Sequence, residues 1–237
     1  MIGSSVSIIL PCYNEADHLE RSIKVLVNHS ADFKFNYEFI FVEDKSTDNT
    51  RQILKGFEST LKNSKFIYHD VNKGRGAAVK SGFEVATGDY VGFIDVDLEV
   101  SPSYINAFVE SLKTHDVVIA NRKYYSKTYL RALIRNIFSN SYRALNKKLL
   151  KHSYSDTEAG YKFFNKKALD NFFKQPSNDH WFWDTEFIMY CFNNKLKVDE
   201  IEVAFLRDET KQSTVKVLRD SLHYLNELIK YTKKNKK

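Results

Sequence analysis

Three acidic side chains alternate with apolar ones where the hydrophobic run at residues 88–100, GDYVGFIDVDLEV, comes to its end. In an extended chain, residues two apart project to the same side, so Asp95, Asp97 and Glu99 would crowd together and repel one another. Three arrangements relieve that repulsion. A divalent cation binds among the carboxylates, an arginine or lysine reaches them from elsewhere in the fold, or the strand simply ends in water.

The elements that must position these acids alternate between strand and helix through the first half of the chain. Apolar runs predict strands at 5–11, 37–44, 65–70, 89–97 and 116–121. Helical spacing predicts helices at 14–29, 46–60 (with Ser46 or Thr47 as its cap), 76–86 and 102–113. Such short alternation predicts an α/β fold whose central sheet is mostly parallel and covered by helices on both faces.

Ligands of such sheets bind outside the carboxyl ends of the strands. The loops expected there read PCYNE, EDKSTD, DVNKGRG, DVDLE and NRK, and they hold most of the distinctive polar residues of the first half. Mg²⁺ typically takes one or two carboxylates and leaves its other positions to water and phosphate. A metal held at Asp95 and Asp97 and open on one side could therefore grip a diphosphate.

The second half of the chain departs from this alternation. Residues 129–150 predict one or two helices, and a closing helix is expected at about 214–232. No acidic residue lies between Asp116 and Asp156, whereas nine basic residues do: Arg122, Lys123, Lys127, Arg131, Arg135, Arg143, Lys147, Lys148 and Lys151. Such a segment either contacts anionic lipid headgroups or packs on the sheet with a solvated basic face, and the two are compatible.

Composition limits the class of protein. With 237 residues, 43% of them hydrophobic, and no repeat or linker, the chain is expected to form a single domain over 1–237. The net charge of +6 favours anionic partners such as nucleotides, lipid phosphate or nucleic acid. Cys12 and Cys191 form no CxxC pair, which favours the cytosol. No apolar run approaches the ~20 residues that span a bilayer, and no signal peptide is evident, so we expect a soluble or peripheral protein.

Several segments, taken together, resemble the family 2 glycosyltransferases of the GT-A fold, and more narrowly the dolichyl- and polyprenyl-phosphate mannose or glucose synthase group. The segments are ILPCYNE, VEDKSTDNT, NKGRGAAVKSG, GDYVGFIDVDLE, DTEAGYKFF and FWDTEFIMY. The resemblance covers residues from about 5 to 230. It implies a Rossmann-like half over about 1–122 that binds the nucleotide-sugar, and a helical acceptor-binding half over about 123–237 with amphipathic basic helices.

The resemblance also assigns roles to particular residues. Pro11, Tyr13 and Glu15 would line the nucleotide pocket, and Asp44 would bind the base or ribose. Asp95, Asp97 and Glu99 would hold Mg²⁺ or Mn²⁺. Arg122 would lie near the phosphates and Arg207 on the acceptor loop. Apart from the resemblance, a leaving diphosphate needs cations to neutralise its charge, and Lys73 and Arg75, which flank Gly74, either supply them or form an exposed basic loop.

The implied activity is inverting transfer of a hexose from UDP- or GDP-hexose to a polyprenyl phosphate at the cytoplasmic membrane face. A phosphate acceptor is already an anionic nucleophile and needs cations more than a base. The alternative is transfer to a hydroxyl of a glycan or other acceptor, with Asp184 or Glu186 as general base. Those two acids could instead bind sugar hydroxyls, or Glu186 could cap or salt-bridge a helix.

Two other classes fit less well. A dinucleotide-dependent dehydrogenase would need glycines in the turn after the first strand, where the sequence reads PCYNEAD, and no GxxxxGK[ST] loop is present. A nucleic-acid binder would bring Asp95, Asp97 and Glu99 against a phosphate backbone. We therefore expect no specific nucleic-acid partner.

Overall fold

The computed structural model describes residues 4–125, 154–175, 177–180, 182–206 and 217–234. The helices predicted at 129–150 lie outside the described residues, as do most of the basic segment and Arg207. The structural statements below concern the described ranges.

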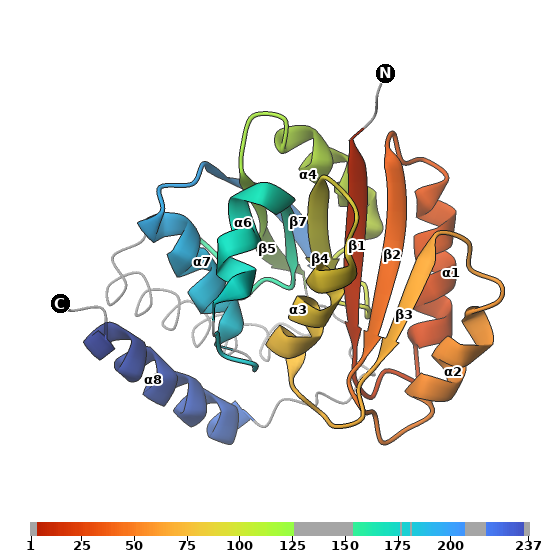
Figure 1. Ribbon diagram of the computed structural model, residues 1–237, viewed down its shortest axis with the longest axis horizontal. Helices are drawn as coiled ribbons and strands as arrows, with labels where there is room; N and C mark the ends of the chain where they lie inside the picture. The colour runs from red at the N-terminus through yellow and green to blue at the C-terminus, as the bar shows by residue number, and fades with distance from the viewer. Residues whose placement is uncertain (1–3, 126–153, 176, 181, 207–216, 235–237) are drawn as a thin grey trace.

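A seven-stranded sheet with the order β3-β2-β1-β4-β6-β5-β7 forms the centre of the fold (Figure 1). Its strands are β1 (Ser5–Cys12), β2 (Asn36–Glu43), β3 (Ser64–Tyr68), β4 (Tyr90–Ile94), β5 (Val117–Tyr125), β6 (Tyr161–Asn165) and β7 (Val198–Leu206). β1 pairs in parallel with β2 and β4, β2 with β3, and β5 with β7, whereas β6 runs antiparallel between β4 and β5. The predicted mostly parallel sheet is confirmed, and the carboxyl ends of every strand except β6 meet at one edge.

Helices cover both faces of this sheet. One face carries α1 (Leu19–Ser30), α2 (Thr50–Phe57), the 3₁₀ turn η1 (Pro102–Tyr104) and α4 (Ile105–Ser111). The other carries α3 (Arg75–Val85), α6 (Lys166–Lys174) and α7 (Trp183–Asn193). The closing helix is α8 (Val217–Lys234), which lies on the side of the molecule away from α1 and α2 (Figure 1). Its Tyr224 and Leu228 pack against Phe182 and Met189. The second half thus contributes two strands to the sheet in addition to its helices.

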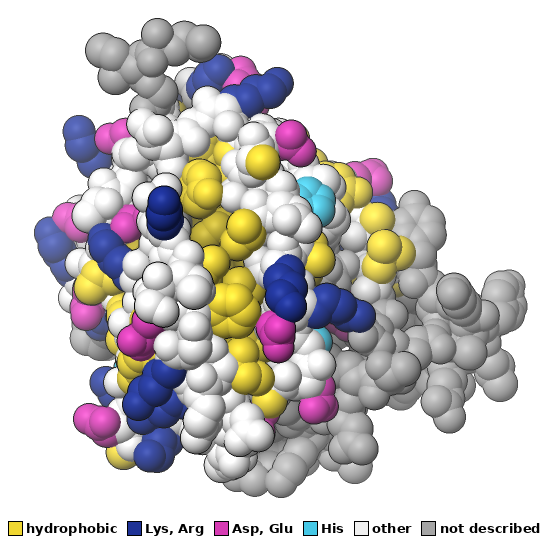
Figure 2. Space-filling view, turned by 90° about the vertical axis from the view of Figure 1, so that its right-hand side faces the viewer, with side chains coloured by type: hydrophobic (Ala, Val, Ile, Leu, Met, Phe, Trp, Pro, Cys, Tyr) yellow, Lys and Arg dark blue, Asp and Glu magenta, His cyan; other side chains and the backbone are white. Residues whose placement is uncertain are grey.

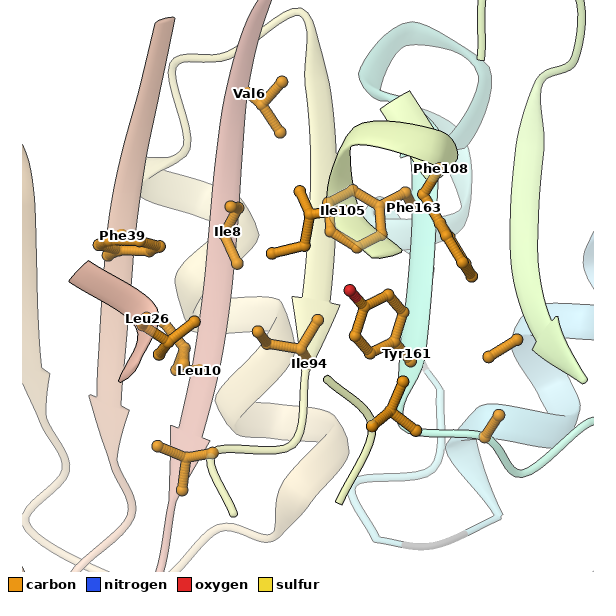
Figure 3. Packing of buried hydrophobic residues seen from close by; sticks show 14 of the residues in the cluster. Val6, Ile8, Leu10, Leu26, Phe39, Ile94, Ile105, Phe108, Tyr161 and Phe163 are labelled. Atoms are coloured by element: carbon orange, nitrogen blue, oxygen red, sulfur yellow. The ribbon is translucent and has the colours of Figure 1, made fainter. Parts of the chain in front are cut away.

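The core follows from the period of two along each strand. Ile8 and Ile9 of β1 are both fully buried, but they belong to the clusters on opposite faces of the sheet. Figure 3 shows one of these clusters, in which Ile8 of β1 lies close to Ile94 of β4 and Ile105 of α4. A strand that is apolar on both faces is what a sheet covered by two helical layers requires.

Most predicted boundaries shift by a few residues, as in β5, which was predicted to end at residue 121 and runs to Tyr125, and three of the shifts have local causes. β4 ends at Ile94 and does not extend to residue 97. α1 begins at Leu19 because a turn occupies the start of the predicted 14–29 helix. α2 begins at Thr50 after Asn49, since Ser46 and Thr47 bond to Asn14 of the loop after β1: the Ser46 hydroxyl accepts from the Asn14 amide N–H, and the Thr47 amide N–H donates to the Asn14 side chain.

Charges of both signs are mixed on the side of the molecule that carries α1, α2 and β3 (Figure 2). Lys65 pairs with Glu38 at 2.7 Å, and Lys24 with Glu20 at 2.6 Å. On this face the net positive charge of the sequence is therefore not gathered into one patch. None of the helices in the described ranges has the length and hydrophobicity to cross a bilayer.

Candidate active site

The three acids at the end of β4 lie on a turn. Asp95 donates its amide to the carbonyl of Gly160 at 2.9 Å, and Leu98 has a positive φ of 56°. A left-handed leucine is uncommon and is held here because its side chain packs against the core. The prediction that Asp95, Asp97 and Glu99 project to one side of an extended strand was therefore wrong, although the turn still brings them to one corner of the sheet edge.

An arginine from α3 neutralises the first of these acids. Arg75 donates to Asp95 Oδ1 from Nη2 at 2.8 Å and from Nε at 3.3 Å. Its third bond runs from Nη1 to Asp184 Oδ2 at 2.6 Å. Burial disfavours the charged guanidinium, but Asp184 and Asp95 outweigh that cost and raise the pKa of Arg75. Of the three ways to relieve repulsion, the structure shows an arginine from elsewhere in the fold at Asp95.

The ion pairs continue inward from Asp184. Lys162 of β6 is fully buried, and its Nζ donates to Asp184 Oδ1 at 2.6 Å and to the carbonyl of Ala159 at 2.5 Å. Burial lowers the pKa of Lys162 below its ordinary value, although Asp184 opposes the shift. Asp95, Arg75, Asp184 and Lys162 thus form one continuous chain of alternating charge, from the sheet edge into the interior.

A small cavity lies at the acidic corner. Its volume is about 10 Å³, roughly the room that one water molecule or ion needs. Its lining residues are Asp95, Asp97, Glu99, Val100, Arg122, Gly160, Tyr161 and Phe205. In the described part of the chain, no group of three or more His, Cys, Asp or Glu side chains is arranged so that it could by itself hold a metal ion. Carboxylates beside an ion-sized space nevertheless fit Mg²⁺ or Mn²⁺, because Mg²⁺ commonly uses one or two carboxylates and takes water and phosphate for the rest.

Arg122 reaches this corner from β5. It binds Asp156 in a two-pronged ion pair, with Nε 2.7 Å from Oδ2 and Nη2 3.0 Å from Oδ1. The guanidinium also lies over the rings of Tyr124 and Phe205. Burial opposes the charge, yet Asp156 raises the pKa of Arg122 above its ordinary value. Arg122 is therefore a fixed positive charge on the wall of the cavity, and Asp156 is the group that fixes it.

The predicted nucleotide-pocket residues lie at the same edge, at the end of β1 and on the loops after β1 and β2. Pro11 is within β1, Tyr13 is exposed, and Glu15 lies 2.7 Å from His18 Nε2. Asp44 is buried, and its carboxylate binds three groups within the chain. They are His69 Nδ1 at 2.7 Å, the Lys73 amide at 2.8 Å and the Gly74 amide at 2.7 Å.

Asp44 therefore fixes the loop between β3 and α3. The Lys73 side chain on that loop is exposed. Gly74 has φ of 98°, a conformation that favours glycine. Arg75 follows this loop as the first residue of α3, and its side chain is bound by Asp95 and Asp184. Lys73 therefore matches the exposed-loop alternative, whereas Arg75 does not.

The two candidate bases occupy different places. Asp184 has both oxygens bound by cations, as described above. Glu186 lines a groove of about 760 Å³ between α6, α7 and α8, and its Oε2 accepts from the Asn178 amide at 2.6 Å. Residues 181–183, weighed as an aromatic stacking surface, include Phe182 and Trp183, and both of these are buried in the core.

Sequence reasoning missed two residues of this site. Gly160 lies so close to Asp95 that a β-carbon there would be 1.9 Å from Asp95 Oδ2. Lys162 lies inside the apolar run YKFF. A lysine in an otherwise buried strand is the signal that could have found it, because a buried ammonium requires a carboxylate partner. No pattern in the sequence paired Lys162 with Asp184, 22 residues away.

The fold and the acidic corner define a class, the GT-A glycosyltransferase fold. A crystal structure of glucosyl-3-phosphoglycerate synthase from Mycobacterium tuberculosis, in complex with Mn²⁺, UDP-glucose and phosphoglyceric acid, superposes with a TM-score of 0.70 at 18% identity. The match covers 97% of this chain and 80% of that one.

The chain belongs to glycosyltransferase family 2, since the model described as "Glycosyl transferase family 2" matches residues 7–173. It is 29% identical to Glycosyltransferase AglD of Haloferax volcanii over 93% of this chain and 36% of the relative. It is 24% identical to the dolichyl-phosphate beta-glucosyltransferase of Saccharomyces cerevisiae over 94% of this chain and 73% of that enzyme. The chain thus spans only about a third of the length of AglD.

Proposed function

We propose that this protein is an inverting glycosyltransferase that moves a hexose from UDP- or GDP-hexose to a polyprenyl phosphate at the cytoplasmic face of a membrane. One observation carries the proposal. In a chain of glycosyltransferase family 2, the carboxyl edge of the sheet presents Asp95, Asp97 and Glu99 around an ion-sized cavity whose wall includes the fixed guanidinium of Arg122.

The donor would bind with its diphosphate at this corner. Asp95 and Asp97, with Glu99, would hold Mg²⁺ or Mn²⁺, and a bound divalent ion offsets the charge of a leaving diphosphate. Arg122 supplies a fixed positive charge on the same wall, and fixed charges of this kind stabilise a transition state without reorganising. The nucleoside would extend toward Tyr13 and Glu15 after β1, near the loop that Asp44 fixes.

The placement of the two candidate bases supports a phosphate acceptor. The Asp184 carboxylate is buried and is bound by Arg75 and Lys162. Glu186 lines the α6–α7–α8 groove, whereas Asp95 lines the corner cavity. A hydroxyl acceptor requires a base near the reacting carbon. A phosphate oxygen is already anionic and does not.

The reaction is a single displacement. An acceptor phosphate oxygen bonds to the anomeric carbon of the hexose while the bond from that carbon to the diphosphate oxygen breaks. The electron pair leaves with the nucleoside diphosphate, and the configuration at the carbon inverts. No proton has to be removed from the nucleophile, so the work of the site is to orient two anions and to neutralise them.

A transfer assay tests the donor and the activity. The protein is incubated with UDP-glucose or GDP-mannose and a polyprenyl phosphate in detergent, with Mn²⁺ or with EDTA, and the lipid is examined by mass spectrometry. We expect a hexose-phosphate lipid from one donor with Mn²⁺ and none with EDTA, with activity restored by excess Mn²⁺. Absence of turnover with every nucleotide-sugar tested, including slow hydrolysis, would overturn the proposal.

A paired assay tests the acceptor. The matching polyprenol, which ends in a hydroxyl, replaces the polyprenyl phosphate, and Glu186→Gln is compared with the wild type. We expect no transfer to the alcohol, and full transfer to the phosphate by the Glu186→Gln variant. Transfer to the alcohol that Glu186→Gln abolishes would establish the hydroxyl-acceptor alternative instead.

The membrane location is tested separately. The basic residues from Lys123 to Lys151 are proposed to contact anionic headgroups, an attraction that falls with ionic strength. Co-sedimentation with phosphatidylglycerol vesicles should decrease as NaCl is raised, and phosphatidylcholine vesicles should retain less protein at every salt concentration. Equal retention by both kinds of vesicle would contradict an electrostatic membrane contact.

A further inference from the structure

The chain of ion pairs from the sheet edge to the interior has no role in the reaction as proposed. Its outer member, Asp95, lines the corner cavity and is 46% exposed. Its inner members are enclosed, because the Arg75, Asp184 and Lys162 side chains are 12%, 4% and 0% exposed. Three charges are therefore largely removed from water directly behind a group proposed to bind metal.

Stability alone does not account for this arrangement. Desolvating an ion pair costs several kcal/mol per ion, and well-packed apolar replacements of buried pairs are often neutral or stabilising. Both cations also lie over the ring of the buried Phe93, Arg75 at 5.4 Å and Lys162 at 5.3 Å from its centroid. An apolar side chain would pack well at positions 75 and 162. The presence of charged residues there therefore indicates that they are needed to orient a neighbouring group.

The hydrogen bonds of these ion pairs fix the orientation of each carboxylate in turn, from Asp184 in the interior to Asp95 at the sheet edge. Lys162 binds one oxygen of Asp184 and Arg75 binds the other, which fixes the plane of that carboxylate. Arg75 then presents Nε and Nη2 to one oxygen of Asp95, Oδ1. Gly160, whose missing side chain leaves room for Oδ2, borders the same carboxylate and also lines the cavity.

We propose that Lys162, Asp184 and Arg75 are positioning residues that orient the Asp95 carboxylate for the divalent cation. Asp184 is then a structural anion between two cations and not a general base. Supporting groups behind a metal ligand commonly affect metal affinity by 10- to 100-fold, although they never contact the ion. This inference rests on the proposed function, because it presupposes that Asp95 binds the metal.

Two variants test it by metal affinity. Arg75→Lys keeps the charge but cannot bridge Asp95 and Asp184 with a planar fork. Lys162→Met keeps the apolar stem but leaves Asp184 with one cation. The Mn²⁺ dissociation constant is measured at saturating UDP or GDP from the free Mn²⁺ signal in electron paramagnetic resonance. We expect it to rise about 10- to 100-fold for Arg75→Lys and by a smaller factor for Lys162→Met.

The control is Lys166→Met. Lys166 follows β6 directly, and its Nζ also donates to a backbone carbonyl, that of Ala86, but at the opposite end of the strand. Its loss should lower the melting temperature without changing Mn²⁺ affinity. If the chain of ion pairs has only a structural role, Arg75→Lys and Lys162→Met should behave like Lys166→Met. Their melting temperatures would fall, and their Mn²⁺ dissociation constants would stay at the wild-type value.

Each outcome distinguishes the two proposals. If wild-type protein binds neither Mn²⁺ nor nucleotide, the proposed function fails and this inference fails with it. If wild-type protein binds both and the Mn²⁺ constants of the folded Arg75→Lys and Lys162→Met variants are unchanged, only the positioning role is overturned. Tighter Mn²⁺ binding by Arg75→Lys would also overturn it, because Arg75 would then compete with the metal for Asp95.

Discussion

The two edges of the central sheet differ in how deeply their charged side chains are buried. At the amino edge, Asp89 accepts from the amide and hydroxyl of Ser5, and Glu38 accepts from Ser7 and Thr87 while pairing with Lys65. Asp89 is exposed and Glu38 is half-buried. These are the ordinary surface contacts that hold one strand end to the next, and exposed pairs of this type contribute about 0–1 kcal/mol.

At the carboxyl edge, charged groups are buried instead. Asp44, Asp156, Lys162 and Asp184 are all nearly inaccessible. Each of the three carboxylates is bound by a cation or by backbone amides, and the Lys162 ammonium donates to Asp184 and to the carbonyl of Ala159. Within the described residues, the sheet thus carries its buried charges at one edge, which indicates that this edge is shaped for binding.

The largest expected effect is on stability, at the centre of the buried chain. Asp184→Ala leaves Lys162 and Arg75 without their shared anion and should cost about 3–5 kcal/mol of unfolding free energy. The matched change at the amino edge, Asp89→Ala, should cost about 1 kcal/mol or less. Urea unfolding followed by circular dichroism measures both. Equal losses would remove the contrast between the edges.

The next effect is on catalysis. Asp97→Asn removes a charge from the corner cavity while keeping the side-chain size, so transfer should fall by about 100-fold or more. Asp89→Asn, at the amino edge, should transfer at the wild-type rate. Both rates are read from initial velocities of hexose-lipid formation. Wild-type transfer by Asp97→Asn would contradict the assignment of the corner.

A glycine pair gives a smaller and more selective effect. In Gly160→Ala the new β-carbon would lie 1.9 Å from Asp95 Oδ2, so the carboxylate must move, at a cost of about 1–3 kcal/mol and with weakened Mn²⁺ binding. At Gly56, inside α2, an added β-carbon would have nothing within 4 Å. Gly56→Ala should therefore stabilise the helix by about 0.5–1 kcal/mol and leave Mn²⁺ binding unchanged. Thermal melts and Mn²⁺ titrations of the two variants, run in parallel, check this.

The smallest effect concerns acid stability at the amino edge. Burial raises the pKa of Glu38, but hydrogen bonds from Lys65, Ser7 and Thr87 outweigh it and lower the pKa to about 2. Because the folded value lies below the unfolded value, its contribution is full above about pH 4.5 and is lost as the pH falls toward 2. Glu38→Gln should remove about 1 kcal/mol at pH 6 after allowance for solvent screening, and less at pH 2.5. A deficit that grows on acidification would contradict this sign.

Much of this architecture could be predicted from the sequence because local patterns carry it. The apolar runs of β1 and β2 and the acids after β4 are contiguous, and the loops at the carboxyl edge follow from strand direction alone. The insertion of antiparallel β6 between β4 and β5 could not be predicted, because pairing between segments some 70 residues apart leaves no local signal.

The ion pairs in the interior of the site could not be predicted from the sequence for the same reason. Arg75, Asp184 and Lys162 come from α3, α7 and β6, and only the folded sheet brings them together. The sequence therefore suggested Asp184 as a base, whereas the structure places it between two cations. Likewise Asp156 aligned with a family signature, but its partner Arg122 became evident only through the ion pair.

A thermal-shift titration tests the central idea most directly, because a ligand that binds only the folded state raises its melting temperature. The wild-type protein is melted with UDP, GDP, ADP or CDP, each with Mn²⁺ and again after chelation with EDTA. We predict that UDP or GDP raises the melting temperature with Mn²⁺ present, that EDTA abolishes the rise, and that Asp97→Asn shows none. If the melting temperature rises equally with EDTA and in Asp97→Asn, or does not rise with any nucleotide, the account of a metal-held diphosphate at the acidic corner is contradicted.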